Sequence, residues 1–311
     1  MSETNLDKYK ASISGKVAIV TGAASGLGRE LSERLAEYNA QVLLVDINNN
    51  VESVSLEINA HVGRNATSWI VCDLCKLQDI QGYFDYALDQ YGHFDIVVNN
   101  AGIANEQSLF SQPDSTELDR IIGVNLRAPM EATRIAVRYF KSNERKGTIL
   151  NTASVGGLLP ISLMESYGTT KAGLMFFTAT CKGLAPLIRV NAVAPYFADT
   201  PLVATNRLVR SYPLVQQVGL MKPEKVIKAM VKAIGDESLA GDTLMVAMGA
   251  KPEVLTFYDS VSFHVTSYII SGTTTRYASA ISSYFARALN SILGYIRNPM
   301  PDLVQAKART D

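Results

Sequence analysis

The segment Lys16–Gly28, K-V-A-I-V-T-G-A-A-S-G-L-G, places a short apolar run directly before a glycine-rich turn. The run stops at Gly22, and apolar residues then follow at helical spacing through Leu31, Leu35 and Tyr38. The pattern therefore predicts a strand, a turn and a helix in succession. Glycine lets such a turn tighten and approach a pyrophosphate at the helix N-terminus. A glycine motif alone is weak evidence, but in this context it predicts a dinucleotide cradle.

The alternation of strand and helix continues along the chain. Residues 41–46 are almost wholly apolar, as expected for a parallel strand covered on both faces. Further strands are expected at 68–72, 94–98, 147–151, 189–194 and 243–246. Helices are expected at 29–39, 77–91, 116–139, 167–185 and 223–234. The sequence thus predicts an α/β fold, a doubly wound, Rossmann-like parallel sheet of about seven strands with helices on both faces.

We expect a single domain over residues 1–250, with an N-terminal arm at 1–12, and a C-terminal extension over 251–311. Within the extension, residues 276–296 carry apolar side chains at spacings of three and four, which predicts an amphipathic helix. We expect this helix to pack on the body or on a sister subunit. Three accompanying arginines leave contact with a membrane surface as the alternative.

Composition narrows the class of protein. The 311 residues are 47% hydrophobic and hold 29 basic and 29 acidic side chains, a balance that argues against a nucleic-acid binder. Three cysteines do not make a disulfide framework. The first residues are polar, and no apolar run approaches the roughly 18 residues that span a bilayer. We therefore expect a cytoplasmic protein.

Two acids follow strands in the cofactor half. Asp46 lies eighteen residues after Gly28, where a carboxylate accepts hydrogen bonds from ribose hydroxyls and repels a 2′-phosphate. This favours NAD over NADP, and the alternative is a solvated turn acid. Asp73 is expected at the adenine edge. Its neighbours Cys72 and Cys75 have a zinc or redox spacing, but no second pair and no grouped histidines accompany them, so we expect no metal.

A proton-transfer pair is predicted downstream. Tyr167 and Lys171 are four residues apart in Y-G-T-T-K, thirteen residues after Ser154. A lysine one helical turn after a tyrosine lies on the same helix face. Its charge favours the phenolate, although the unperturbed pKa of tyrosine is about 10. The phenol thereby becomes usable as a base near neutral pH.

Six motifs occur in a fixed order: T-G-A-A-S-G-L-G, N-N-A-G at residues 99–102, G-V-N-L with Asn125, N-T-A-S with Ser154, Y-G-T-T-K, and N-A-V-A-P followed by Thr200. Together they resemble the short-chain dehydrogenase/reductase superfamily across about residues 13–250. The resemblance implies that Ser154 would hold the substrate oxygen and Tyr167 would exchange its proton. Lys171 would hold the nicotinamide ribose and lower the tyrosine pKa, and Asn125 would hold a water next to Lys171.

The resemblance also assigns binding residues. The cofactor positions it implies are Gly22, Ser25, Gly26, Leu27, Gly28, Asp46, Ile47, Asp73, Leu74, Asn100, Ala101, Gly102, Tyr167, Lys171, Pro195 and Thr200. The substrate positions are Ser154, Val155, Leu163, Tyr167 and Tyr196. One departure is visible, since Tyr196 stands where the family usually has glycine, and this puts substrate placement in doubt.

The expected substrate is lipophilic. Residues 155–164, which line the pocket in this family, and 201–209, which form its mobile lid, are mainly apolar. We therefore expect NAD-dependent oxidation of a secondary alcohol on a terpenoid, steroid or fatty-acid-like molecule. An NADPH-dependent carbonyl reductase is the alternative and needs Arg29, or a group near Asn48, to take the 2′-phosphate. A second alternative is a non-catalytic dinucleotide-binding protein. The resemblance implies a homo-dimer or homo-tetramer.

Overall fold

The structure is a computed structural model, and it describes residues 7–248 and 253–255. These residues belong to one compact unit, Met1–Leu255. The expected C-terminal extension beyond residue 255, with its helix at 276–296, lies outside the described residues.

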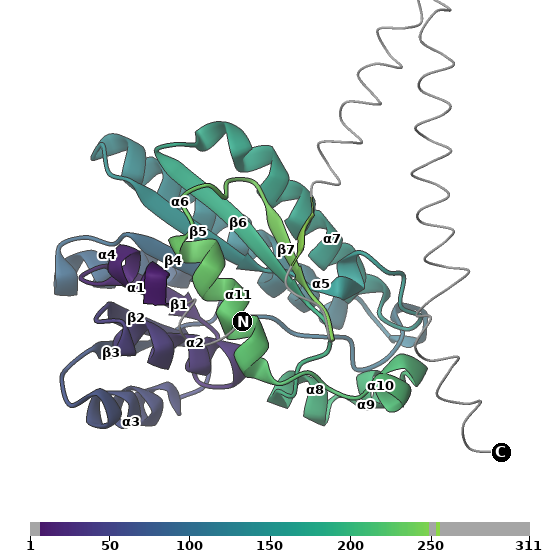
Figure 1. The fold of residues 1–311 in the computed structure, drawn as a ribbon. Coiled ribbons are helices and arrows are strands. Elements are labelled where there is room, and N and C mark those ends of the chain that lie inside the picture. The colour runs from purple at the N-terminus through teal and green to yellow at the C-terminus, as the bar shows by residue number, and fades with distance from the viewer. Residues whose placement is uncertain (1–6, 249–252, 256–311) are drawn as a thin grey trace, which may run out of the picture. The chain divides into compact units, whose positions relative to one another are not determined.

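An eight-stranded sheet with the order β3-β2-β1-β4-β5-β6-β7-β8 forms the centre of the fold (Figure 1). The strands are β1 Val17–Thr21, β2 Gln41–Asp46, β3 Thr67–Val71, β4 Ile96–Asn99, β5 Gly147–Thr152, β6 Ile188–Pro195, β7 Thr243–Val246 and β8 Glu253–Leu255. The first seven are parallel, so the predicted fold class is confirmed. The short β8 pairs antiparallel with β7 and was not predicted, because three residues show no usable periodicity.

Helices cover both faces of the sheet, and the longer ones connect successive parallel strands. They are α1 Asp7–Ile13, α2 Gly26–Glu37, α3 Val51–Val62, α4 Leu77–Tyr91, α5 Thr116–Ile122, α6 Ala128–Ser142, α7 Glu165–Thr180, α8 Pro201–Thr205, α9 Arg207–Ser211, α10 Pro213–Val218 and α11 Pro223–Gly235. Among the residues that the structure describes, no helix is both long enough and apolar enough to cross a membrane.

Among the helices that the sequence did not predict are α1 and α3. Most of α1 lies in the predicted N-terminal arm, and its Tyr9 hydroxyl donates to Asp236 at 3.2 Å. An added Cβ on Gly235 would lie 2.7 Å from Tyr9 Cβ, so glycine lets α11 approach α1. The helix α3 was not predicted, although Val51, Val54 and Ile58 form a buried stripe at helical spacing. Three consecutive asparagines before it masked the start of the pattern.

Strand residues alternate between two cores. In β1, Ala18 and Val20 pack in the core that includes residues of α2, α3 and α11, whereas Val17 and Ile19 pack in the core beneath α4 and α6. All four side chains are buried. Burial on both faces explains why the strand sequence is continuously apolar.

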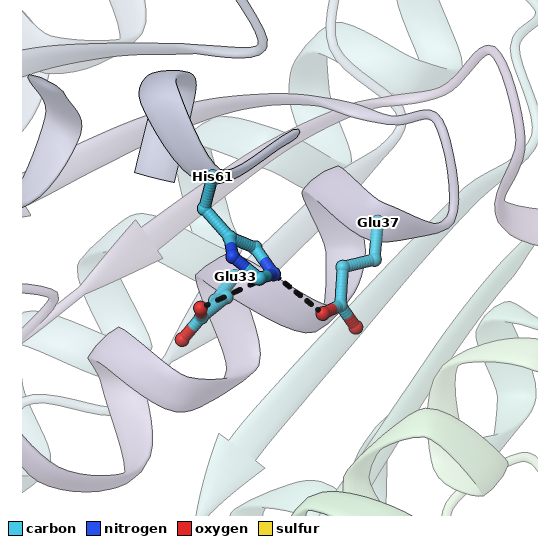
Figure 2. A group of neighbouring side chains, drawn as sticks. All are labelled: Glu33, Glu37 and His61. Carbon is cyan, nitrogen blue, oxygen red and sulfur yellow. Dashed lines mark hydrogen bonds and ion pairs between the residues drawn. The ribbon is translucent and has the colours of Figure 1, made fainter. Parts of the chain in front are cut away.

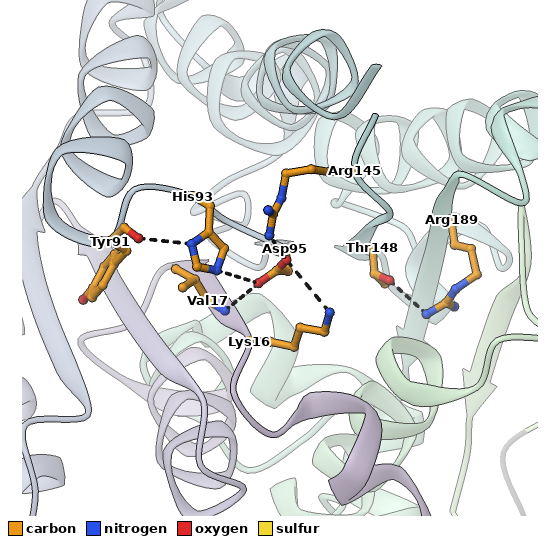
Figure 3. A network of polar contacts seen from close by, with 8 residues as sticks. All are labelled: Lys16, Val17, Tyr91, His93, Asp95, Arg145, Thr148 and Arg189. Atoms are coloured by element: carbon orange, nitrogen blue, oxygen red, sulfur yellow. Dashed lines mark hydrogen bonds and ion pairs between the residues drawn. The ribbon is translucent and has the colours of Figure 1, made fainter. Parts of the chain in front are cut away.

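A buried carboxylate fixes the strand ends opposite the turn that follows β1 (Figure 3). Asp95 precedes β4 and is 5% exposed. Its Oδ2 accepts a hydrogen bond from the Val17 amide at 2.9 Å, and its Oδ1 accepts one from Arg145 at 2.8 Å. His93 and Lys16 approach the same carboxylate at 3.4 and 4.0 Å. One side chain thus ties β1 to the segments that enter β4 and β5.

A second charged group joins α2 and α3 at the surface (Figure 2). The Nε2 atom of His61 lies 3.3 Å from a Glu37 oxygen and 3.8 Å from a Glu33 oxygen. All three side chains are more than a third exposed. Exposed ion pairs contribute at most about 1 kcal/mol, so this group adds little to stability.

We predict that Asp95→Ala lowers the free energy of unfolding by about 3 kcal/mol, because it leaves a buried amide and cations without their acceptor. Urea denaturation followed by circular dichroism measures the change. The exposed Asp89→Ala serves as a control and should change stability by less than about 0.5 kcal/mol. Equal small effects in both variants would contradict this role for Asp95.

Candidate active site

The turn between β1 and α2 leaves no room for a side chain at Gly22 or Gly28. Gly22 has φ +67° and Gly26 has φ +51°, a region that favours glycine. A Cβ on Gly28 would lie 2.0 Å from the carbonyl oxygen of Gly22, and one on Gly22 would lie 2.8 Å from the Cα of Ala101. The exposed helix start and close backbone approach fit the pyrophosphate of a dinucleotide.

The end of β4 is fastened to this turn. The Asn100 side-chain amide donates to the carbonyl oxygens of Thr21 at 3.0 Å and Gly22 at 3.3 Å. The backbone amide of Asn100 donates to the Thr21 hydroxyl at 3.0 Å. Segment 100–102 is therefore held directly against the turn.

Asp46 ends β2 with its carboxylate partly exposed. Its Oδ2 accepts from the Ala24 amide at 2.9 Å, and its Oδ1 accepts from the Asn48 amide at 2.9 Å. These bonds orient the carboxylate beside the glycine turn. Asp73 lies after β3, and its Oδ1 accepts a hydrogen bond from the Cys75 amide at 3.0 Å. Both acids line one cavity with the turn.

This cavity has a volume of about 340 Å³ and lies at the carboxyl ends of the parallel strands. The strand order reverses between β1 and β4, which is where open α/β sheets bind ligands. Of the predicted cofactor residues, those that line it are Gly22, Ser25, Gly26, Leu27, Asp46, Ile47, Asp73, Leu74, Asn100, Ala101, Gly102, Tyr167, Lys171, Pro195 and Thr200. Gly28 packs behind the turn instead.

Ser154, Tyr167 and Lys171 line the same cavity. The Lys171 ammonium group donates to the carbonyl oxygen of Thr152 at 2.7 Å and lies 5.7 Å from the centre of the Tyr167 ring. The Ser154 hydroxyl accepts from the Gly156 amide at 3.1 Å. Because Lys171 is 3% exposed, its charge acts in a largely desolvated region.

Burial shifts the pKa values of this pair in opposite senses. It raises the pKa of Tyr167, and the hydrogen bond with Ser154 opposes that rise. It lowers the pKa of Lys171 to about 8. The structure therefore differs from the expectation that the lysine leaves the tyrosine pKa lowered. The reason is that complete burial disfavours the charged form of both groups.

Asn125 lies behind the cavity. It belongs to a π-helical segment, Gly123–Arg127, which interrupts the helix expected over 116–139. Such segments are frequent at functional sites. Its Oδ1 accepts from the Ile103 amide at 2.9 Å, and its Nδ2 donates to the Ile103 carbonyl at 2.8 Å. A Cβ added to Gly102 would lie 3.4 Å from Asn125 Oδ1 and 3.3 Å from Lys171 Nζ. Glycine at position 102 thus leaves the narrow space between the Asn125 and Lys171 side chains free.

The substrate side of the cavity is apolar, and two of the predicted residues do not line it. Val155 is buried in the core, and Leu163 is 44% exposed; neither lines the cavity. Ile161 and Met164, from the same loop, line it instead. The path of the backbone determines which side chains of this loop face the cavity, and at Leu163 the backbone adopts the left-handed φ of +68°. Apolar sequence alone does not reveal which side chains turn inward.

The cavity wall also includes residues around the predicted lid. Val203 of α8 and Val209 of α9 line it and are almost fully buried. Tyr196 lines it as predicted, and its ring packs edge-on against Phe197 with centroids 5.1 Å apart. Tyr196 therefore forms part of an aromatic wall.

Sequence reasoning missed several lining residues, among them Thr152, Arg120 and Phe197. Thr152 serves Lys171 through its backbone carbonyl, so its residue type carried no signal. Arg120 lies on α5 outside every motif. Phe197 directly follows Tyr196, and no motif singled it out.

The two neighbouring cysteines also line the cavity. Both are free thiols. Burial, which is the largest cause, raises the pKa of Cys72 to about 12. A thiol with so high a pKa is a poor nucleophile and a poor metal ligand at neutral pH.

Comparison with known proteins identifies the family of the chain. Residues 16–210 match the short chain dehydrogenase family. The chain is 28% identical to a Bos taurus protein named 15-hydroxyprostaglandin dehydrogenase [NAD(+)], over 81% of this chain and 98% of that one. It is 32% identical to the Thermotoga maritima 3-oxoacyl-[acyl-carrier-protein] reductase, over 73% and 93% of the two chains.

Among solved structures, one of a 3-ketoacyl-(acyl-carrier-protein) reductase from Brucella melitensis, complexed with NADH, superimposes with a TM-score of 0.68. It shares 31% identity and covers 76% of this chain and 98% of its own. The chain belongs to the short-chain dehydrogenase family. It is accordingly an oxidoreductase that uses a nicotinamide cofactor and acts on alcohol or carbonyl groups.

We predict a specific pH dependence of stability from Lys171. Its folded pKa, about 8, lies below the unfolded value of about 10.4, so the unfolded chain binds more protons between these values. The destabilising effect of the buried charge is full below pH 8 and disappears as the pH rises towards 10. The difference in unfolding free energy, wild type minus Lys171→Met, should therefore rise across that window. A flat difference in urea denaturation would contradict it.

Proposed function

We propose that the protein oxidises a secondary alcohol of a lipophilic small molecule to a ketone with NAD. The observation that carries this proposal is that Ser154, Tyr167 and Lys171 face one cavity. Asp46 and the glycine turn line the same cavity, and apolar residues form the rest of its wall. A proton acceptor and a dinucleotide cradle therefore open on a common space.

The side chains divide the chemistry as follows. The Ser154 hydroxyl binds the oxygen of the substrate, and the Tyr167 phenolate accepts the proton from that oxygen. A nicotinamide held beside Lys171 would supply the redox chemistry, as the acceptor of the hydride from the carbinol carbon. Lys171 holds positive charge near the phenol and binds the nicotinamide ribose. Asn125, packed next to Lys171 across Gly102, holds the water that links the lysine to solvent.

The apolar wall favours a lipophilic substrate. Met164, Val203 and Val209 form a small apolar cluster with Ile161 and Phe197 packed on it. A sugar or polyol would leave hydroxyl groups unpaired against this surface, at a cost of about 1–3 kcal/mol for each. Terpenoid, steroid and fatty-acid-like secondary alcohols fit it better. The bovine relative, whose name specifies a hydroxyprostaglandin, is consistent with that class.

The preference for NAD rests on the surroundings of Asp46. Its carboxylate is oriented by two backbone amides, so turning it away from a ribose breaks both bonds. The cation that NADP binding would recruit, Arg29, is paired with Glu57 at 2.6 Å. A bound 2′-phosphate would face a fixed negative charge at this point.

A second candidate is the reverse reaction, a carbonyl reductase. The Thermotoga maritima relative, which is named as a reductase, favours it. The same side chains serve both directions, because Tyr167 then donates the proton that it would otherwise accept. Cofactor preference separates the candidates. For the assembly we propose a homo-dimer or homo-tetramer, as the family resemblance implies.

We predict that Tyr167→Phe lowers kcat by about 10²–10⁴-fold, because it removes the proton acceptor and leaves the cavity shape unchanged. The absorbance rise of reduced nicotinamide, measured over a panel of hydrophobic secondary alcohols and polyols, tests it. Wild-type turnover of the hydrophobic alcohols with NAD is expected. Turnover of polyols only, or full activity of the variant, would overturn the proposal.

We further predict that Asp46→Asn reduces the preference for NAD over NADP by about ten-fold or more, since the amide removes the charge and also replaces one of the two oxygens that accept from backbone amides. The ratio of kcat/KM for the two cofactors measures this. Asp73→Asn is the matched control and should leave the ratio unchanged. An unchanged ratio in the Asp46 variant would mean that another group selects the cofactor.

A further inference from the structure

Asn105 occupies an unusual place beside the proposed catalytic tyrosine. It lies in the loop between β4 and α5 and is fully buried. Its Oδ1 accepts a hydrogen bond from the backbone amide of Tyr167 at 3.0 Å. Tyr167 is the third residue of α7, where an amide has no partner within the helix. A side chain from a distant segment therefore caps the helix that carries the tyrosine.

The local sequence does not supply this cap. The residue before α7 is Met164, which makes no capping bond. Serine, threonine, aspartate or asparagine at that position would satisfy the amide directly. Instead the first turn of α7 depends on Asn105, and its position is tied to the loop.

Asn105 also contacts the wall of the cavity on its other side. Its backbone carbonyl accepts a hydrogen bond from the Asn206 side-chain amide at 2.7 Å. Asn206 in turn caps α9, because its Oδ1 accepts from the Val209 amide at 3.1 Å. Val209 is 3% exposed and lines the apolar part of the cavity. Three hydrogen bonds thus connect a substrate-facing residue to the backbone of Tyr167.

The loop that carries Asn105 is clamped on both sides. Before it, Ile103 exchanges two hydrogen bonds with Asn125. After it, the Ser108 hydroxyl and the Leu109 amide donate to the Glu165 carboxylate at 3.1 and 3.2 Å. Glu165 is the first residue of α7. Hydrogen bonds therefore tie the loop to the start of α7, and Asn206 ties α9 to the loop.

We propose that Asn105 is a positioning residue that couples the placement of α9 against the substrate to the placement of the Tyr167 hydroxyl. The inference rests on the proposed function, in which Tyr167 is the proton acceptor. A substrate that packs against Val209 fixes α9, and the bonds through Asn206 and Asn105 then fix the first turn of α7. The hydroxyl is held in this way where Ser154 bonds to it.

Hydrogen–deuterium exchange of the purified protein tests the coupling without a substrate. Asn206→Asp keeps an oxygen that can cap α9 and replaces the amide donor to Asn105 with a second oxygen, so the hydrogen bond to the Asn105 carbonyl is lost and becomes a repulsion. We expect this variant to raise the exchange rate of the peptide containing Tyr167 by about three-fold or more, although residue 206 makes no bond with α7. Asn105→Ala should raise it by about ten-fold or more.

Kinetics with an alcohol from the panel separate positioning from folding. In Asn105→Ala we expect kcat to fall about ten-fold while the dissociation constant for NAD changes less than two-fold. The hydrogen bond with Ser154 lowers the pKa of Tyr167, so a phenol that loses this bond has a higher pKa. The rising limb of the pH profile should therefore move to higher pH.

The outcomes distinguish the two claims. If Tyr167→Phe keeps full activity, the proposed function fails. If that variant is inactive but Asn105→Ala and Asn206→Asp keep wild-type kcat and exchange, the coupling fails and the proposed function stands. Exchange changes in Asn206→Asp that stay confined to residues 201–211 also overturn the coupling. Should Asn105→Ala not fold, the Asn206→Asp comparison still decides.

Discussion

The burial of Lys171 is the constraint on which the site depends. An ammonium group within a protein is costly unless it is hydrogen-bonded, and here the carbonyl oxygen of Thr152 accepts its bond at 2.7 Å. That carbonyl is the end of β5, so the central sheet itself supplies the acceptor. Gly102 leaves the space beside the ammonium group that any Cβ would crowd. The lowered pKa of Lys171, about 8, records the destabilisation that remains.

The rest of the site is arranged around that group by the topology of the sheet. Parallel strands bring their carboxyl ends to one edge, and the reversal of order between β1 and β4 opens a cavity there. The acids proposed to bind the cofactor lie at the end of β2 and after β3, whereas the proposed catalytic residues lie after β5 and in the first half of α7. Stability is provided at the opposite edge, where Asp95 holds the strand entrances together. The two edges therefore serve separate purposes.

The fold was predictable because its signals are local and repeated. Continuous apolar strands alternate with helical spacing, and the glycine turn predicts the connection of β1 to α2. The cavity lining was predictable wherever residue type carries the chemistry, as at Asp46 and Lys171. Prediction failed where orientation decides, because Leu163 turns out to solvent and Met164 turns in. It also missed backbone partners such as the Thr152 carbonyl.

Asn105 illustrates a related limit of sequence reasoning. It is one asparagine in a polar loop, I-A-N-E-Q-S, and nothing in its neighbours marks it. Its importance arises only from three segments that meet in space, the loop after β4, the start of α7 and α9. A helix that carried its own cap would not depend on the cavity wall. In the proposed coupling, the position of Tyr167 depends on Asn105 and, through Asn206, on the cavity wall.

Tyr167 is a buried phenol, and in the proposed function it becomes the proton acceptor. Its ionisation is measured directly by carbon NMR of protein labelled at tyrosine Cζ, with Tyr167→Phe identifying the signal. In the free protein, we predict titration above the ordinary tyrosine value, because burial raises the pKa of Tyr167. With saturating NAD, the pKa should fall, since a positive charge near the phenol favours its ionised form. An identical titration with and without NAD, or one at the ordinary value in the free protein, would contradict the account.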